Sequence, residues 1–279
     1  MGARLAQLRH GALDRVARLS PRGQRVLRLY STPKLSARRI SDLRGLSACE
    51  AKATSQNGED GILLGLFGLI GTTDRRFCEF GFHFGQNNSI ELAAHGWQGL
   101  LLDGSPSAAT LRARALATRG IKVRRAFITA ESVNAQIGAE LSGPIDFLSV
   151  DIDGNDYWVW RALTVVEPRV VCVEYRVYMG TEEAVSMPYD PAFQWDRAGD
   201  PAFLGASVAA FEKLGRAKGY RLVYLERAGV NAFFVREDCL EGMDVPPLAE
   251  LAAGVPALAE TMRPGWRMDP GLRARLVDV

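Results

Sequence analysis

Three aspartates stand within six residues of the chain, at Asp151, Asp153 and Asp156. They follow the mostly apolar run 145–150, which has the composition of a buried strand. Crowded carboxylates repel one another unless a proton or a cation lies between them, and hard divalent cations such as Mg²⁺ or Mn²⁺ take oxygen ligands of this kind. We therefore predict a metal site with these three ligands, with Asp151 also serving catalysis. The competing interpretation is a helix N-cap at Asp153 or Asn155 among solvated acids.

A glycine turn is predicted in the segment 77–85, which has the sequence FCEFGFHFG. Glu79 precedes the first glycine, Gly81, and Gly85 comes four residues later. Glycine lets a backbone approach a ligand closely. A site for the pyrophosphate of a dinucleotide would have the pattern GxGxxG. The GxxxG spacing therefore favours a cofactor without a pyrophosphate, and a turn that only serves packing is the alternative.

A second acidic position, Asp103, ends the apolar run 99–103 and lies 22 residues after Gly81. In doubly wound folds, a carboxylate at the end of the second strand accepts hydrogen bonds from the ribose hydroxyls of an adenosine. Both NAD and S-adenosylmethionine sites have this requirement. Because the third glycine of a dinucleotide site is missing, we predict S-adenosylmethionine.

The elements that must position these residues alternate between short apolar runs and helical patterns from about residue 55. This alternation implies βαβ units and a parallel sheet. The predicted strands are 76–82, 99–103, 122–126, 145–151 and 170–175, and the predicted helices are 58–70, 88–95, 106–118, 131–139, 155–163 and 206–218.

Two further apolar runs, 220–225 and 232–235, are separated by only six residues. Because six residues cannot form a helical crossover, these strands should pair antiparallel. A mostly parallel sheet that ends in an antiparallel hairpin resembles the class I methyltransferase fold, which is a Rossmann-like α/β fold.

An ordered set of motifs over about 55–236 resembles the FkbM-type S-adenosylmethionine-dependent methyltransferases. The set consists of 55–60 (SQNGED), 79–81 (EFG), 87–89 (NNS), 96–99 (GWQG), 103–105 (DGS), 151–156 (DIDGND), 168–171 (PRVV), 174–175 (EY), 205–207 (GAS) and 229–235 (GVNAFFV). The resemblance implies O-methylation of a hydroxyl on a sugar, a glycan or a natural product.

The resemblance also implies roles for individual residues around the cofactor. Glu79, Gly81 and Gly85 would line the cofactor loop, and Asp103, followed by Ser105 in its motif, would hold the ribose. Gln56 and Glu59 would lie near the methionine end. The loop between the two glycines departs from the small or acidic residues expected there, since it reads Phe82-His83-Phe84.

A hydroxyl acceptor must lose its proton, which requires a base tuned near neutral pH or a metal that acidifies the hydroxyl. His83 fits the first role, because the unperturbed pKa of histidine is about 6.5. An ordinary hydrogen-bonded loop histidine is the alternative. Glu174 ends the predicted fifth strand and should lie at the same crevice, so we include it among the catalytic candidates and as the alternative to Asp156 for the third metal ligand.

Charge divides the chain into an arm and a domain. Residues 1–48 hold eleven Lys and Arg against two Asp, a charge of +9, whereas the rest carries −7. We predict a basic helical arm at 1–48 that contacts a second subunit or an anionic membrane surface, and the alternative is a solvated helix that packs on its own domain. The cofactor-binding domain would span 49–239, with a lid or insertion at 176–205, and 240–279 would pack on it as a C-terminal extension.

Composition excludes several other classes of protein. No apolar run approaches the roughly 18–20 residues of a membrane span, and the N-terminus lacks a secretory pattern, so we expect a cytoplasmic protein. The four cysteines contain no CxxC pair, which argues against zinc. We expect a small-molecule or carbohydrate acceptor and no nucleic acid. Two alternatives stay open: a metal-dependent glycosyltransferase that uses Asp151 and Asp153, and a non-catalytic relative that binds the cofactor.

Overall fold

The computed structural model describes residues 33–81, 86–104, 120–194 and 204–279. Several predicted features lie outside the described residues. They are His83, Gly85 and the rest of their loop, Ser105, the predicted helix 106–118, part of the predicted lid, and the first 32 residues of the basic arm.

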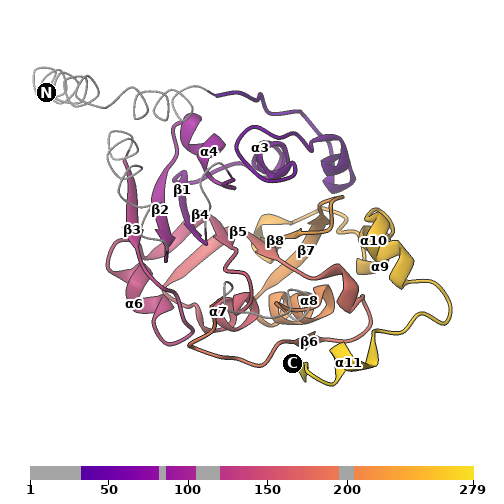
Figure 1. The fold of residues 1–279 in the computed structure, drawn as a ribbon. Coiled ribbons are helices and arrows are strands. Elements are labelled where there is room, and N and C mark those ends of the chain that lie inside the picture. The colour runs from indigo at the N-terminus through magenta and orange to yellow at the C-terminus, as the bar shows by residue number, and fades with distance from the viewer. Residues whose placement is uncertain (1–32, 82–85, 105–119, 195–203) are drawn as a thin grey trace, which may run out of the picture.

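A seven-stranded sheet with the order β3-β2-β1-β4-β5-β8-β7 forms the centre of the molecule (Figure 1). Strands β1 to β5 pair in parallel, and β8 runs antiparallel to both β5 and β7. This is the class I methyltransferase fold, as predicted. The strands are β1 (Arg76–Phe80), β2 (Gln98–Asp103), β3 (Ile121–Arg125), β4 (Gly143–Val150), β5 (Val166–Glu174), β7 (Tyr220–Leu225) and β8 (Asn231–Arg236).

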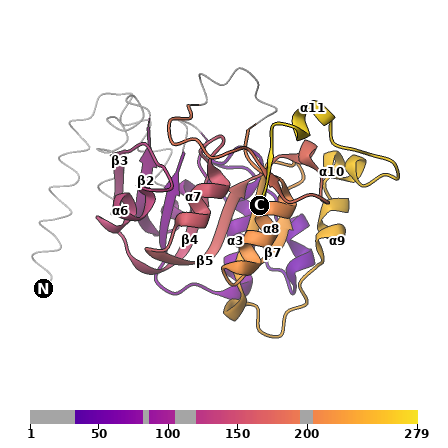
Figure 2. The same ribbon diagram turned by 90° about the horizontal axis from the view of Figure 1, so that it is seen from below.

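Helices cover both faces of the sheet, which explains why its strands are apolar on both sides (Figure 2). On one face lie η1 (Leu43–Ala48), α3 (Glu59–Ile70) and α4 (Ile90–Ala94), packed on Phe77 and Phe147 of the sheet. On the other face lie α6 (Val133–Gly138), α7 (Asp156–Ala162) and α8 (Val208–Ala217), around Trp160 and Phe234. Helices α3, α4, α6, α7 and α8 match predicted helices to within a few residues, whereas η1 was not predicted.

The sequences of α3 and α8 suit their different surroundings. Helix α3 is apolar on most sides and buried, with Glu59 and Asp60 in its first turn. The Asp60 carboxylate accepts hydrogen bonds from the backbone amides of residues 53–55, so it fixes the loop that leads into the helix. Helix α8 is amphipathic, and the Ser207 hydroxyl caps it by accepting a hydrogen bond from the Ala210 amide.

The packed core begins before residue 49, where we placed the boundary of the predicted arm. Leu43 and Leu46 of η1 are buried against α3. Arg44 of the same helix forms ion pairs with Asp244 and Glu250 of the C-terminal extension, at 2.8 Å and 2.6 Å. Residues 43–48 therefore pack as part of the domain.

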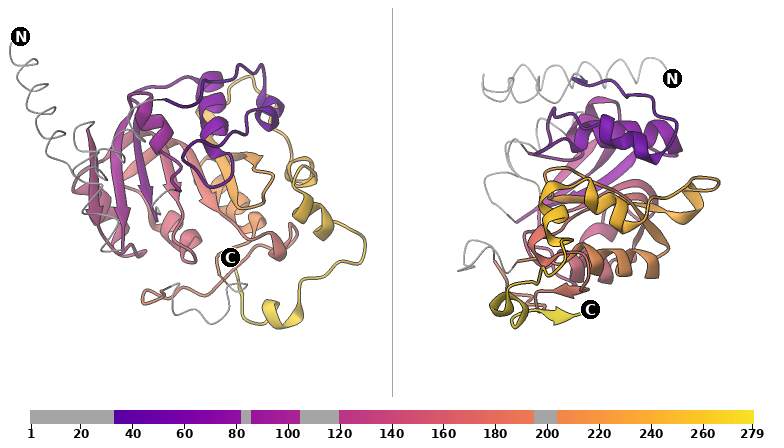
Figure 3. Two further views of the ribbon diagram at one scale, coloured as in Figure 1. Left: turned by 45° about the horizontal axis from the view of Figure 1, so that its top comes forward. Right: turned by 90° about the vertical axis from the view of Figure 1, so that its right-hand side faces the viewer.

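The C-terminal extension packs along one side of the domain (Figure 3) and joins the insertion after β5. Its last strand, β9 (Val277–Asp278), pairs antiparallel with β6 (Val185–Ser186) of that insertion. A separate small core of methionine and aliphatic side chains from both segments lies between them. The remaining short elements are η3 (Val177–Met179), η6 (Glu237–Cys239), α9 (Leu248–Ala253), α10 (Pro256–Thr261) and α11 (Pro270–Arg273). Within the described ranges, no helix has the length and apolar character needed to span a membrane.

Candidate functional site

The sheet register brings four of the predicted site residues into one row. Phe80 ends β1, and its partners on β2 and β4 are the residues directly before Asp103 and Asp151. The register of β4 with β5 places Asp151 beside Glu174 in the same way. Asp103, Gly81, Asp151 and Glu174 therefore follow one another across the carboxyl edge of the sheet. The chain turns from one side of the sheet to the other between β1 and β4, where doubly wound folds bind their ligands.

Three carboxylates gather at this edge. Asp151, Asp153 and Glu174 each offer an oxygen, and these oxygens lie within 4.8 Å of one another. We call these three side chains the acid trio. Arg176 donates hydrogen bonds to both oxygens of Glu174, at 2.8 Å and 3.1 Å. Asp153 adopts a backbone φ of +60°, an unfavourable conformation for a residue with a side chain, and such strain is common at functional sites.

Burial and mutual repulsion disfavour the ionisation of Asp151 and Glu174, whereas the side chain of Asp153 is exposed. Burial raises the pKa of Asp151 well above its usual value, and the carboxylates of Glu174, Asp156 and Asp153 add to this shift. Burial also raises the pKa of Glu174 to about 8, with the neighbouring acids adding to the effect and Arg176 opposing it. A bound divalent cation would offset this repulsion, and the all-oxygen donor set is the type that Mg²⁺ or Mn²⁺ takes.

Asp156, which we predicted as the third ligand, has a different role in the structure. Its two carboxylate oxygens accept hydrogen bonds from the backbone amides of Ile152 and Gly154, both at 2.8 Å. Burial raises its pKa to about 6 in spite of these two hydrogen bonds. Because Asp156 sits in the first turn of α7 and closes its own loop, it is not part of the trio, and Glu174 from the neighbouring strand stands in its place.

The backbone at position 81 requires a glycine, for a reason that the sequence did not indicate. It has a φ of +79°, and a Cβ atom there would lie 1.3 Å from the carbonyl oxygen of Asp151. Its amide donates a hydrogen bond to the Leu102 carbonyl. The close approach that needs glycine is thus to the backbone of β4, and it brings the ends of β1 and β4 together beneath the site.

Glu79 is buried and anchors the start of α4. Its carboxylate accepts hydrogen bonds from the Asn88 amide at 2.9 Å and the Ser89 amide at 3.0 Å, and also from the Ser89 hydroxyl. Burial raises its pKa above the usual value. Glu79 therefore positions the segment that follows the glycine loop, and both of its oxygens are engaged within the protein.

Glu59 and Gln56, both predicted near the cofactor, differ in their burial. Gln56 is exposed, whereas Glu59 is fully buried and accepts a hydrogen bond from the Asn231 side chain at 2.7 Å. Glu59 also interacts with the carboxyl group of Glu226, and a hydrogen bond between the two requires a proton on one of them. Asn231 pairs with Glu174 in the register of β5 and β8, so this second carboxyl pair lies one strand beyond the trio.

The Glu59–Glu226 pair is most simply described as one carboxylate and one carboxylic acid. Burial opposes ionisation of Glu59, but the hydrogen bonds from Glu226 and from the amides of residues 57 and 58 outweigh it and lower the pKa to about 2. Burial and the adjacent Glu59 charge raise the pKa of Glu226 to about 8. Glu226 belongs to none of the motifs in the sequence. The only signal for its surroundings was the GVNAFFV motif, which contains Asn231.

Comparisons with known proteins match the chain only to solved structures of low identity. No protein-family model matches it, and no curated protein matches its sequence. An O-methyltransferase from Bacillus cereus in complex with SAH is 20% identical with a TM-score of 0.42, covering 69% of this chain and 86% of that one.

Two further solved structures are similar at lower identity. A putative caffeoyl-CoA O-methyltransferase from Staphylococcus aureus is 14% identical, with a TM-score of 0.43 and coverage of 61% of this chain and 79% of that one. The N-terminal domain of EvdMO1, in the presence of SAH and D-fucose, is 14% identical, with a TM-score of 0.40 and coverage of 59% and 75%. The assignment to the FkbM type therefore stays a proposal.

Proposed function

We propose that this chain is an S-adenosylmethionine-dependent O-methyltransferase of the FkbM type that acts on a hydroxyl of a sugar, a glycan or a natural product with the help of a divalent metal. The observation that carries the proposal is the position of the acid trio. It stands at the carboxyl edge beside the junction of β1 and β4, in the same row as Asp103. The edge thus combines an acid suited to a ribose with a cluster suited to a cation.

On the cofactor side, Asp103 would accept hydrogen bonds from the ribose hydroxyls, because it ends β2 one strand away from the Gly81 turn. Neighbouring strands lie about 4.8 Å apart, so two strand spacings, about 10 Å, separate Asp103 from Asp151. The bound cofactor supplies an activated methyl group, and the protein contributes mainly the alignment of acceptor and methyl. The 82–85 loop and Ser105 would complete this side.

On the acceptor side, Asp151, Asp153 and Glu174 would hold Mg²⁺ or Mn²⁺. A metal there orients acceptor oxygens and lowers the pKa of a hydroxyl. Arg176 fixes the orientation of the Glu174 carboxylate through two hydrogen bonds, and each Glu174 oxygen keeps a second lone pair for the cation that Asp151 and Asp153 also face. His83 is the alternative base, and it stays a prediction. The cytoplasmic location and the contact of the basic arm with a membrane or a second subunit also stay predictions.

Two binding measurements test the proposal without an identified acceptor. Calorimetry with S-adenosylhomocysteine should give a saturable heat, and Asp103→Asn should weaken the binding by about 1.5–3 kcal/mol, the value of a lost charged hydrogen bond. Mn²⁺ binding, followed by electron paramagnetic resonance, should be lost in Glu174→Gln and kept in Glu241→Gln, a change at an exposed acid outside the trio.

The two results separate the parts of the proposal. Unchanged affinity for S-adenosylhomocysteine in Asp103→Asn would remove the ribose assignment. Equal Mn²⁺ binding by the wild type and Glu174→Gln would remove the metal site and leave His83 as the base to test.

A further inference from the structure

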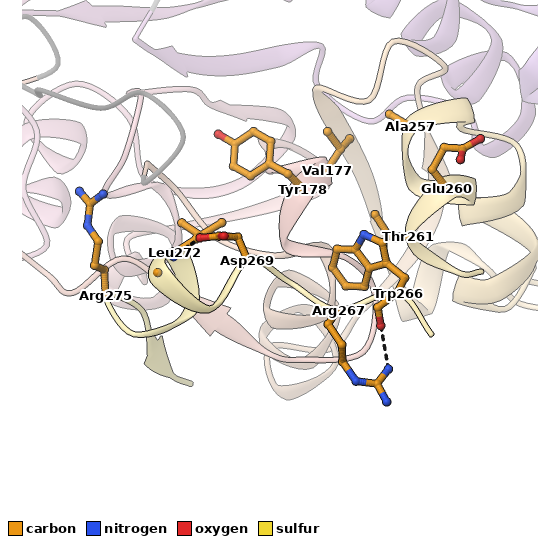
Figure 4. Close-up of a pocket in the computed structure, with 11 residues that line it drawn as sticks. Val177, Tyr178, Ala257, Glu260, Thr261, Trp266, Arg267, Asp269, Leu272 and Arg275 are labelled. Carbon is orange, nitrogen blue, oxygen red and sulfur yellow. Dashed lines mark hydrogen bonds between the residues drawn. The ribbon is translucent and has the colours of Figure 1, made fainter. Parts of the chain in front are cut away.

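A cavity of about 820 Å³ lies between η3 and the C-terminal helices α10 and α11 (Figure 4). This volume is within the range of small-molecule sites, about 300–1,000 Å³. The cavity is lined by Val177 and Tyr178 from the insertion and by Trp266 and Leu272 from the C-terminal extension. Two segments about ninety residues apart in the chain therefore form one pocket.

The two aromatic side chains of the pocket are half-buried, and the indole of Trp266 is held in place from behind. Gly180 has a φ of +70°, and a Cβ atom there would lie 2.8 Å from the indole ring. The absence of a side chain at this position thus lets Trp266 rest on the backbone. A fixed aromatic surface that also lines a cavity offers a ring-shaped ligand a large contact area at little cost in side-chain entropy.

The charged side chains of the pocket cancel. Arg267 and Arg275 are matched by Glu260 and Asp269, and all four are exposed. These side chains already have partners within the protein: Arg267 donates a hydrogen bond to the Trp266 carbonyl, Asp269 accepts one from the Leu272 amide, and Glu260 forms an ion pair with Arg263. A lining without net charge does not favour a phosphate or a polyamine. It does provide hydrogen-bond donors and acceptors around aromatic walls, which suits an uncharged ring that bears hydroxyl groups.

The pocket adjoins the acceptor side of the acid trio. Tyr178 follows Glu174 by four residues, and a chain of four residues spans at most about 14 Å. Between them, Arg176 makes its two hydrogen bonds to Glu174 and lies close enough to Tyr178 for an electrostatic interaction. The Tyr178 side of the pocket therefore begins within about 14 Å of the trio along the chain.

The geometry points to a subsite for an uncharged glycosyl unit, formed by Tyr178 and Trp266 and distinct from the ring that would carry the methylated hydroxyl. The acceptor would then be a glycoside or an oligosaccharide of at least two rings. The assignment of the bound glycosyl unit as part of the methyl acceptor rests on the proposed function. The binding of a sugar in the pocket does not depend on that function.

The test is saturation-transfer-difference NMR with a fixed panel, recorded on the full chain without cofactor. The panel contains the neutral disaccharides maltose, cellobiose and lactose, the monosaccharides glucose and galactose, and the charged ligands glucose 1-phosphate and UDP-glucose. We expect at least one disaccharide to bind more tightly than its monosaccharide. Trp266→Ala should weaken that binding about tenfold, the usual effect of losing a central aromatic contact.

Three further variants control for folding and location. Trp266→Phe keeps an aromatic wall and should retain most of the affinity, and Tyr178→Ala should lose it as Trp266→Ala does. Met262→Ala changes an exposed residue of the same extension outside the pocket lining and should bind like the wild type.

Three outcomes would overturn the inference. The first is that no disaccharide binds at about 20 mM, a concentration above the millimolar range of weak specific binding. The second is binding that is insensitive to both Trp266→Ala and Tyr178→Ala, and the third is Trp266-dependent binding of only the phosphorylated ligands. The proposed function fails separately, through the calorimetry with S-adenosylhomocysteine. Sugar binding without cofactor binding would keep the subsite and remove its role in methyl transfer.

Discussion

Acidic side chains in opposite electrostatic situations lie along β4 and directly after it. In the amino-terminal half of the strand, Asp146 is fully buried, and its oxygens accept hydrogen bonds from the amides of residues 73–75 and from the Arg169 guanidinium. Burial opposes its ionisation, but these donors outweigh the effect and lower its pKa. At the carboxyl end, Asp151 lies among other carboxylates, and its pKa is raised.

This difference shows how a buried structural acid is distinguished from a candidate site. Asp146 has a donor for each oxygen and ties the β1 entry loop and β5 to one point of the sheet. In the trio, carboxylates neighbour one another at positions where a buried acid would normally have hydrogen-bond donors. Arg176 is the cation for which the structure describes hydrogen bonds to the trio. Unfavourable charge that folding does not relieve is a common property of functional sites.

The largest expected effect comes from Asp146→Ala. The change leaves Arg169 without its carboxylate and removes the acceptor for three amides, and breaking a partly buried pair of this kind costs about 3–5 kcal/mol. Urea unfolding followed by circular dichroism should show that loss. The folded fraction should bind S-adenosylhomocysteine with unchanged affinity, because Asp146 is at the far end of the strand. A loss below about 1 kcal/mol would remove the structural role that we assign.

The matching change at the other end of β4 is Asp151→Asn. It keeps the shape of the side chain and removes one of the crowded charges, so the free energy of unfolding should stay within about 0.5 kcal/mol or rise. Methyl transfer and Mn²⁺ binding should each fall by at least about tenfold, the lower range for disturbing a metal site. Thermal unfolding and Mn²⁺ titration on the same sample check both parts. Strong destabilisation with intact Mn²⁺ binding would place Asp151 in the same class as Asp146.

The Glu59–Glu226 pair extends the comparison between Asp146 and the trio, because it lies at the carboxyl edge of the sheet and yet is buried from solvent. Glu226 titrates near pH 8 in the folded protein and at an ordinary glutamate pKa in the unfolded chain. The folded state therefore binds the extra proton between about pH 4.5 and 8, and stability from this group falls as the pH rises through that window.

Glu226→Gln should abolish this part of the pH dependence. The variant should exceed the wild type in unfolding free energy by about 2 kcal/mol at pH 8 and by less at pH 5, after discounting for relaxation around the pair. Urea unfolding at several pH values measures the difference. Parallel curves for the two proteins would mean that the pair does not share a proton.

The smallest expected effect is at Asp153, where the backbone strain of the site is visible. Asp153→Gly relieves the positive φ and should raise the free energy of unfolding by about 0.5–1 kcal/mol, while it lowers the affinity for Mn²⁺. Asp153→Asn is the control, because asparagine tolerates this conformation better than most residues but lacks the charge. Lower stability in the glycine variant would show that the positive φ is not strained.

Much of the fold follows directly from the order of residues in the chain. The parallel strands are runs of apolar residues because both of their faces are covered, and that composition is visible without a structure. The short link between β7 and β8 forces antiparallel pairing for the same local reason. The position of β8, between β5 and β7, is not local, because it depends on which edge of the sheet remains free for the last strands.

The candidate site also combines features that are local in the sequence with features that depend on long-range packing. The sequence by itself placed Asp151 and Asp153 after a buried strand and Asp103 after another, since a carboxylate at a strand end is a local feature. Only the tertiary structure decided between Asp156 and Glu174 as the third member of the cluster, because neighbours across a sheet are set by the register between strands far apart in the chain. Only the tertiary structure showed that the C-terminal extension contacts the insertion, through the pairing of β9 with β6 and the pocket beside it. These contacts depend on long-range packing, which leaves no periodic signal in the sequence of either segment.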